Sequence, residues 1–267
     1  MKEPFPSLDC SQIVNYLEKD FFEDLPEIFI TETTGSTNDD AKSFLTEQSD
    51  PISIHLTEQQ VAGRGRNGKK WISPKGKNIY LSLGWKTTLK YSQLDGLSLA
   101  LGTVIAKTLN EYIDQHIKIK WPNDLLFEKK KISGILVETI DLNDQIGVVM
   151  GIGINVHMSP EDGKEIDQSW ISLDEATNSI RDRNKVIADL LNELIKLTIS
   201  FPIEGFRPFM KDFEKLNILK GKQCNISTDG SNKIVDVLGV NGKGELLVRY
   251  NSENLTLRYG EVSIREL

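Results

Sequence analysis

The stretch Gly63–Trp71, with the sequence GRGRNGKKW, constrains this chain more than any other segment. It places three glycines among four cationic residues, and Lys75 and Lys77 extend the basic run. From Arg64 to Lys77 there are six basic residues and no acidic one, although the whole chain carries a net charge of -7. Arginine binds phosphates and carboxylates through two parallel hydrogen bonds, and glycine lets backbone N–H groups approach an anion closely. The stretch therefore predicts a flexible loop that binds a phosphate or a carboxylate.

Two nucleotide-binding motifs share these letters. The glycine spacing is that of the dinucleotide fingerprint G-x-G-x-x-G, and residues 63–69 also match a P-loop up to Lys70, where a P-loop has Ser or Thr. Both motifs need a helix directly after the glycines, because the helix N-terminus holds the phosphate. Pro74 and Gly76 would break such a helix within a turn. Rossmann and P-loop folds are thus excluded, whereas a basic surface hairpin or a nucleic-acid patch stays open.

Composition narrows the class further. A chain of 267 residues, 39% of them hydrophobic and 27% charged, is typical of a soluble globular protein with one large core and a small satellite domain. No apolar run approaches the roughly 20 residues that span a bilayer, and the N-terminus lacks a secretory signal. Cys10 and Cys224 show no metal-ligand spacing, which favours a reducing cytoplasm. Without H-E-x-x-H or G-x-S-x-G, a zinc enzyme and a Ser-His-Asp hydrolase are not expected.

Hydrophobic periodicity predicts an α+β domain. Apolar residues at helical spacing predict helices over 11–25, 92–112 and 185–201, and alternating residues predict strands over 52–56, 79–83, 117–121, 132–138 and 146–152. Ser36 is the expected N-cap of a further helix, with Asp39 three residues later as in a capping box.

The C-terminal part differs in character. Short alternating strands near 223–227, 233–238 and 245–250 are separated by the turn signals Asp229-Gly230 and Asn241-Gly242. This predicts a small β-barrel, which would be marginally stable alone and is expected to pack on the larger domain. The predicted organisation is a short N-terminal segment (1–28), a catalytic domain (29–218) and the barrel (219–267).

Four further short sequence segments, here called blocks, accompany the basic loop along the chain. They are Ser36-Thr37-Asn38, Lys120-Trp121-Pro122-Asn123-Asp124, K-I-S-G-I-L-V-E over 131–138 and G-I-G-I-N over 151–155. In this order, and over about residues 30–267, the chain resembles the biotin protein ligases (biotin–[acetyl-CoA carboxylase] ligases). The resemblance implies a mixed-sheet catalytic domain of the biotin/lipoate ligase type and an SH3-like C-terminal barrel.

The resemblance also implies the reaction. Biotin and ATP give biotinyl-5′-AMP and pyrophosphate, and a lysine of a biotin carboxyl carrier protein then takes the biotinyl group, with Mg²⁺ accompanying ATP. Carboxylate and phosphate repel one another, so the first step needs nearby cations. A basic loop that closes over the adenylate and excludes water suits this task.

Site residues follow from the resemblance. Lys131, Arg66 and Asp124 are the implied catalytic side chains: Lys131 stabilises transition-state charge, and Asp124 holds the incoming lysine or a magnesium ion. The implied biotin-binding residues are Ser36, Thr37, Asn38, Gln60, Gly63, Arg64, Gly65, Arg66, Trp71, Lys131 and Gly134. The implied nucleotide-binding residues are Arg64, Arg66, Lys69, Asn123, Asn155 and Trp170. No dedicated metal site is expected, because Mg²⁺ is held largely by phosphates and water.

Several of these residues have plainer interpretations. The run Lys129–Lys131 is typical of a solvated turn, Ser36 of a helix cap, and Trp170 of a core aromatic residue. Asn67 departs from relatives that carry a further arginine there, which is expected to tune affinity.

Two other functions remain as alternatives. A lipoate ligase or octanoyl transferase shares the general fold but would lack the basic loop and the K-W-P-N-D block. A nucleic-acid-binding regulator would use the basic loop, and some biotin ligases are repressors with an N-terminal helix-turn-helix domain. Only about 30 residues precede the Ser-Thr-Asn block here, and the chain is acidic. The prediction is a monofunctional cytoplasmic ligase, monomeric or weakly dimeric, that binds neither DNA nor membranes.

Overall fold

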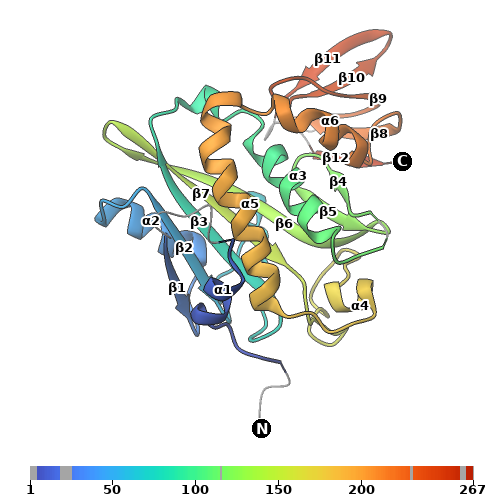
Figure 1. The fold of residues 1–267 in the computed structure, drawn as a ribbon. Coiled ribbons are helices and arrows are strands. Elements are labelled where there is room, and N and C mark those ends of the chain that lie inside the picture. The colour runs from blue at the N-terminus through green and yellow to red at the C-terminus, as the bar shows by residue number, and fades with distance from the viewer. Residues whose placement is uncertain (1–4, 19–25, 115, 229–230, 259–262, 267) are drawn as a thin grey trace.

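A seven-stranded mixed sheet forms the centre of the molecule in the computed structural model, which describes residues 5–18, 26–114, 116–228, 231–258 and 263–266 (Figure 1). Its strands are β1 (Glu27–Thr31), β2 (Ile52–Thr57), β3 (Ile79–Thr87), β4 (Lys118–Lys120), β5 (Asp124–Phe127), β6 (Lys130–Leu142) and β7 (Gln145–Ile154). They lie in the order β1-β2-β3-β7-β6-β5-β4. Only β1 and β2 are parallel to one another; every other neighbouring pair is antiparallel. The mixed sheet expected from the sequence is confirmed.

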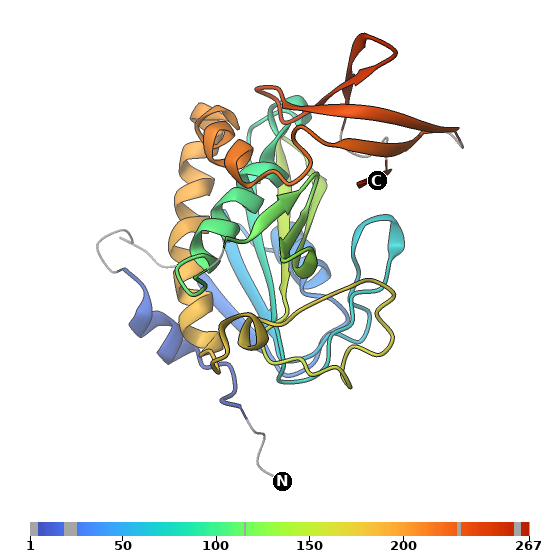
Figure 2. The same ribbon diagram turned by 90° about the vertical axis from the view of Figure 1, so that its right-hand side faces the viewer.

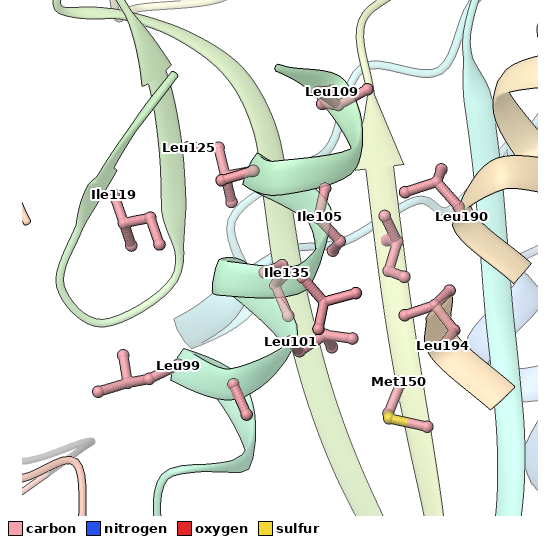
Figure 3. Packing of buried hydrophobic residues seen from close by; sticks show 14 of the residues in the cluster. Leu99, Leu101, Ile105, Leu109, Ile119, Leu125, Ile135, Met150, Leu190 and Leu194 are labelled. Atoms are coloured by element: carbon pink, nitrogen blue, oxygen red, sulfur yellow. The ribbon is translucent and has the colours of Figure 1, made fainter. Parts of the chain in front are cut away.

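Helices cover one face of this sheet. They are α3 (Leu97–Leu109) and α5 (Arg183–Glu204), which pack on one another, with α1 (Cys10–Tyr16) against α5 and α6 (Arg207–Leu216) against α3. Leucine and isoleucine side chains of α3 and α5 meet Ile135 of β6 and Met150 of β7 in the main core (Figure 3). Because successive strand residues point to opposite faces, this core takes every second residue of the central strands.

The opposite face carries α2 (Thr37–Glu47) and a group of long loops (Figure 2). Ala41 and Leu45 of α2 pack on Val149, the neighbour of Met150, in a small cluster separate from the main core. Within the described segments, no other α-helix covers this face (Figure 2). It is therefore the face on which a cavity can form.

Some element boundaries differ from those expected. The helix expected over 92–112 begins at Leu97, because Tyr91–Gln93 form a 3-10 turn and Gly96 has a φ of 82°, which ends any helix before it. Helix α1 ends at Tyr16, and residues 19–25 of that prediction lie outside the described residues. Strands β1 and β5 and helices α4 (Leu173–Thr177) and α6 were not predicted.

The prediction for the N-terminus of α2 is confirmed for the position of the cap but not for its hydrogen bonds. Ser36 is the N-cap residue, but its side chain makes no capping hydrogen bond. Asp39, expected to complete a capping box, instead accepts two hydrogen bonds from Arg64. A charged partner from another loop outcompetes the local backbone for this carboxylate.

A second sheet follows α6 and confirms the small C-terminal β-domain. Its strands are β8 (Gln223–Thr228), β9 (Ser231–Val240), β10 (Leu246–Tyr250), β11 (Glu253–Leu257) and β12 (Ser263–Glu266), antiparallel in the order β11-β10-β9-β8-β12. It is joined to the main domain by a shared hydrophobic core and by hydrogen bonds. The Trp121 indole N–H donates to the Gly244 carbonyl at 3.1 Å, and the Val240 N–H donates to Glu214 Oε1 at 2.9 Å. Among the helices of the described segments, none is long and apolar enough to cross a membrane.

Candidate functional site

The basic stretch folds as a hairpin that projects from the open face of the sheet. The Trp71 N–H donates to the Gly63 carbonyl at 2.9 Å, and the Gly65 N–H donates to the Lys69 carbonyl at 2.7 Å. At the tip, Asn67 has a φ of 55°. Asparagine adopts this left-handed conformation more readily than arginine does, which gives the departure from relatives a conformational reason. No helix follows the glycines, as Pro74 and Gly76 predict.

A cavity of about 820 Å³ lies between this hairpin and the sheet. In Figure 2 the hairpin is the cyan loop, and the yellow loop beside it, around residues 155–172, forms another wall. Ile264 of β12 adds a residue from the C-terminal sheet. The lining includes every predicted site residue except Gly63: Ser36, Thr37, Asn38, Gln60, Arg64, Gly65, Arg66, Lys69, Trp71, Asn123, Asp124, Lys131, Gly134, Asn155 and Trp170. Residues from five separate blocks of sequence thus meet at one place.

Glycines form the floor of the cavity. Gly134 of β6 and Gly153 of β7 are direct neighbours across the sheet, and the Trp71 ring lies on both. A Cβ at Gly153 would lie 2.5 Å from this ring, and a Cβ at Gly151 would meet the Asn38 side chain. The absent side chains therefore make the space that Trp71 and Asn38 occupy.

Lys131 reaches this floor through an irregularity in β6. Leu125 of β5 pairs with Ser133, whereas Leu126 pairs with Lys131, so Ile132 is an extra residue on one strand of the pair. Such a β-bulge re-aims side chains. As a result the Lys131 Nζ lies 2.7 Å from Asp124 Oδ1 and 5.5 Å from the centre of the Trp71 ring. The solvated-turn interpretation fits Lys129, which is exposed, but not Lys131, whose side chain is 14% exposed.

Neutral polar groups form one wall. Gln60 Oε1 accepts from the Thr37 backbone N–H at 3.0 Å and hydroxyl at 3.2 Å, and Gln60 Nε2 donates to Ser73 Oγ at 3.2 Å. Ser82, fully buried on β3, donates to Asn38 Oδ1 at 2.6 Å. The network holds donors and acceptors in fixed directions without a formal charge, which suits an uncharged polar ligand group.

The positive charge of the hairpin is largely balanced by distant carboxylates. Arg64 Nη1 and Nη2 donate to Asp39 at 2.7 and 2.6 Å, and Nη2 also donates to Glu138 Oε2 at 3.1 Å. Further ion pairs join Lys70 to Glu165, Lys75 to Glu32 and Lys77 to Asp162. The local sequence window, which contains no acidic residue, therefore overstates the charge that the folded hairpin offers to an anion.

These pairs shift the pKa values of their members. The hydrogen bond from Arg64 lowers the pKa of Asp39, and the same contact raises the pKa of Arg64. Burial would raise the pKa of Glu138, but hydrogen bonds from Lys42 and Asn38 outweigh it and the net pKa is lowered. All three groups are thus held in their charged forms.

The predicted nucleotide-side residues Asn123, Asn155 and Trp170 also line the cavity. Arg66 Nη1 donates to Asn123 Oδ1 at 3.3 Å. Asn155 is buried and donates to the Lys131 and Ile171 carbonyls at 3.3 Å each, so it supports the backbone of the wall. Trp170 is half-buried at the cavity edge, which argues against a core aromatic residue.

Three side chains that support this site are not among the predicted site residues: Asp39, Glu138 and Ser82. No sequence motif assigns them to the site, although Glu138 ends the K-I-S-G-I-L-V-E block and Ser82 interrupts an apolar strand. An isolated polar residue in a buried strand is the only signal that points to Ser82.

Comparison with known proteins agrees with this geometry. The model of the biotin/lipoate A/B protein ligase family matches residues 30–155. The bifunctional ligase/repressor BirA of Escherichia coli K12 is 33% identical, over 99% of this chain and 80% of its own length. The chain belongs to the biotin protein ligase family.

Other members of the biotin protein ligase family support this. The biotin–[acetyl-CoA-carboxylase] ligase of Mycobacterium tuberculosis H37Rv is 29% identical, over 88% of each chain. Among solved structures, the biotin protein ligase of Aquifex aeolicus in complex with biotin and ATP has a TM-score of 0.76 and 26% identity, over 91% of this chain and 100% of that one. The resemblance first seen in short blocks of sequence extends to nearly the whole fold.

Proposed function

We propose that the cavity under the Gly63–Trp71 hairpin carries out both steps of the biotin protein ligase reaction. Biotin is first activated with ATP as biotinyl-5′-AMP, and the biotinyl group then passes to a lysine of a biotin carboxyl carrier protein. The observation that carries the proposal is the convergence of the predicted site residues on one cavity, with the Lys131 ammonium at its floor.

Biotin fits the end of the cavity next to α2. The neutral network of Ser36, Thr37, Asn38 and Gln60 matches a ureido ring, which carries no charge. Trp71, lying on Gly134 and Gly153, provides the apolar surface for the rest of biotin.

The charged end of the cavity fits the reacting groups. Lys131 is placed to stabilise charge that develops as the carboxylate attacks the α-phosphate. Arg64, Arg66 and Lys69 supply further cations on the hairpin, and Asn123, Asn155 and Trp170 form the nucleotide side. Among the described residues no group of three His, Cys, Asp or Glu side chains forms a metal site. Mg²⁺ is expected to arrive with ATP, because this ion is commonly held by substrate phosphates and water.

Asp124 belongs to the second step. Its carboxylate already holds one ammonium, that of Lys131, at 2.7 Å. The same oxygens are suited to an incoming acceptor lysine, which must lose a proton before it attacks.

Incubation of the protein with ATP, Mg²⁺ and either biotin or lipoate tests this function. Pyrophosphate release and an acid-labile adenylate are expected with biotin, followed by transfer of label to a carrier domain. Release with lipoate alone would favour the lipoate ligase alternative, and no biotin-dependent release would refute the proposal. With Arg66→Ala the intermediate is expected to escape and to label lysines of bystander proteins.

The absence of DNA binding, the monomeric or weakly dimeric state and the domain boundaries at 28/29 and 218/219 stay predictions. Tight, specific DNA binding in a gel-shift experiment would contradict the predicted absence of DNA binding. This test matters because the similar BirA of Escherichia coli is a bifunctional ligase/repressor. A cytoplasmic location rests on the cysteine content alone.

A further inference from the structure

Arg64 lines the cavity, but its guanidinium is already paired with carboxylates of the protein. Its guanidinium forms a forked pair with Asp39, at 2.7 and 2.6 Å, and its Nη2 also reaches Glu138 Oε2 at 3.1 Å. A forked arginine–carboxylate pair fixes direction as well as distance. The hairpin is thereby joined at its root to α2 and to β6.

Glu138 is the centre of this junction. Besides Arg64 it accepts hydrogen bonds from Lys42 Nζ at 2.7 Å on Oε1 and from Asn38 Nδ2 at 2.7 Å on Oε2. Its side chain is 24% exposed, so solvent screens these contacts less than it screens an ion pair on the open surface. One carboxylate therefore connects the hairpin, the first two turns of α2 and the sheet.

Glu138 also acts on the biotin wall. Asn38 is held between Glu138, which accepts from its Nδ2, and Ser82, which donates to its Oδ1 at 2.6 Å. Gly151 lies beneath it, and no side chain larger than hydrogen fits there. Asn38 Nδ2 also donates to the Leu136 carbonyl at 3.4 Å, so the orientation of the amide is set by partners on both of its ends.

We propose that Glu138 is a positioning residue, which fixes the Gly63–Trp71 hairpin over the cavity through Arg64 and orients Asn38 toward biotin. This rests on the proposed function, in which the hairpin and Asn38 hold biotin. Arg64 then contributes mainly by holding the hairpin in place, while Arg66 and Lys69 meet the anionic groups of the substrates. Asp39 also holds Arg64, but its side chain is 57% exposed and therefore lies at the protein surface.

Glu138→Gln tests the proposal, because it keeps the size of the side chain and removes its charge. Limited trypsin digestion measures hairpin position directly, since Arg64, Arg66, Lys69 and Lys70 are all cleavage sites within it. Cleavage in the hairpin is expected to rise by roughly fivefold or more. The Kd and KM for biotin are expected to rise by about tenfold, because the Asn38 amide loses its hydrogen bond to a charged acceptor. The kcat of adenylate formation at saturating biotin stays within about twofold, which a general structural defect would not allow.

Glu32→Gln is the matched control. It removes an ion pair to Lys75, four residues beyond the hairpin, from a side chain that is 76% exposed and lies outside the cavity lining. Its cleavage pattern and biotin affinity should equal those of the wild type.

Wild-type cleavage and affinity in Glu138→Gln would overturn the proposal. If Glu138→Gln does not fold, Asp39→Asn tests the proposal instead, because it removes the other carboxylate that Arg64 binds. Faster trypsin cleavage of the hairpin in Asp39→Asn supports the proposal, and an unchanged cleavage rate overturns it. If the wild type binds no biotin, the proposed function fails, whereas the trypsin result still reports on the junction.

Discussion

The Lys131 ammonium lies 2.7 Å from the Asp124 carboxylate, and the two residues reach this distance from neighbouring strands of the sheet. With side chains 14% and 25% exposed, both are shielded from solvent but open to the cavity. Under the proposed function, the pair presents an ammonium to the first step of the reaction and a carboxylate to the second.

Lys131→Ala should reduce adenylate formation by roughly 10²–10³ in kcat, the usual effect of removing one preorganised group that stabilises transition-state charge. Single-turnover pyrophosphate release measures it. Lys130→Ala is the control, because the neighbouring lysine pairs with exposed Glu175 at 3.5 Å outside the cavity lining. Equal rates for the two variants would remove Lys131 from its proposed role.

Gly153→Ala should weaken biotin binding and cost about 1–3 kcal/mol of unfolding free energy, because the new methyl group would displace the Trp71 ring. A Cβ there would lie 2.5 Å from that ring. Titration calorimetry with biotin and urea unfolding measure the two effects. Gly35→Ala, where an added Cβ meets nothing within 4 Å, should change neither. Unaltered biotin affinity in Gly153→Ala would mean that Trp71 is not a wall of the biotin site.

Glu58→Gln should destabilise the fold by roughly 3–5 kcal/mol, because it leaves a buried arginine without its countercharge. Glu58 and Arg183 lie 2.7 Å apart with side chains 9% and 1% exposed, and they also bind the backbone of Pro6 and Leu8. Urea unfolding measures the loss. The exposed pair of Lys215 with Asp212 is a suitable contrast: Asp212→Asn should cost less than about 1 kcal/mol.

Stability should fall below pH 6.5 because of His55. Burial lowers the pKa of this histidine from 6.5 to about 4. Between these values the unfolded chain binds a proton that the folded protein does not, so unfolding becomes easier as pH falls from 6.5 to 4. The full loss is about 3 kcal/mol, and above pH 6.5 this residue has no effect. Urea titrations at several pH values should show a smaller slope for His55→Gln than for the wild type over that window, and equal slopes would contradict the assignment.

Local sequence patterns predict much of this fold. Apolar spacing predicts α5 and the centre of α3, and alternation predicts β2, β3 and β7, because each signal depends on neighbours along one segment. The short strand β5 is not predicted, since four residues carry too weak a periodicity. Helix α6 is also missed, although its apolar residues Phe209, Phe213 and Leu216 recur at helical spacing.

The site residues that lie in the short sequence blocks can be predicted from the sequence. The ion-pair partners of these residues cannot: Glu138 and Arg64 are 74 residues apart, and no local pattern shows that they meet. The basic run therefore suggests a more positive surface than the folded hairpin presents. Asp39 shows the same limit, since its spacing from Ser36 predicts a cap that a distant arginine prevents.

The extra residue in β6 has a consequence for how this enzyme can change over evolution. Lys131 and Gly134 meet on one side of the sheet only because Ile132 has no counterpart on β5. In an uninterrupted strand two positions three apart point to opposite sides. Regular pairing of the same four residues, without the bulge, would leave every chemical group present and turn the ammonium toward the leucine-rich core. The spacing K-x-x-G is thus compatible with this site only together with the bulge at Ile132, and a strand without the bulge must keep the lysine and the glycine an even number of positions apart.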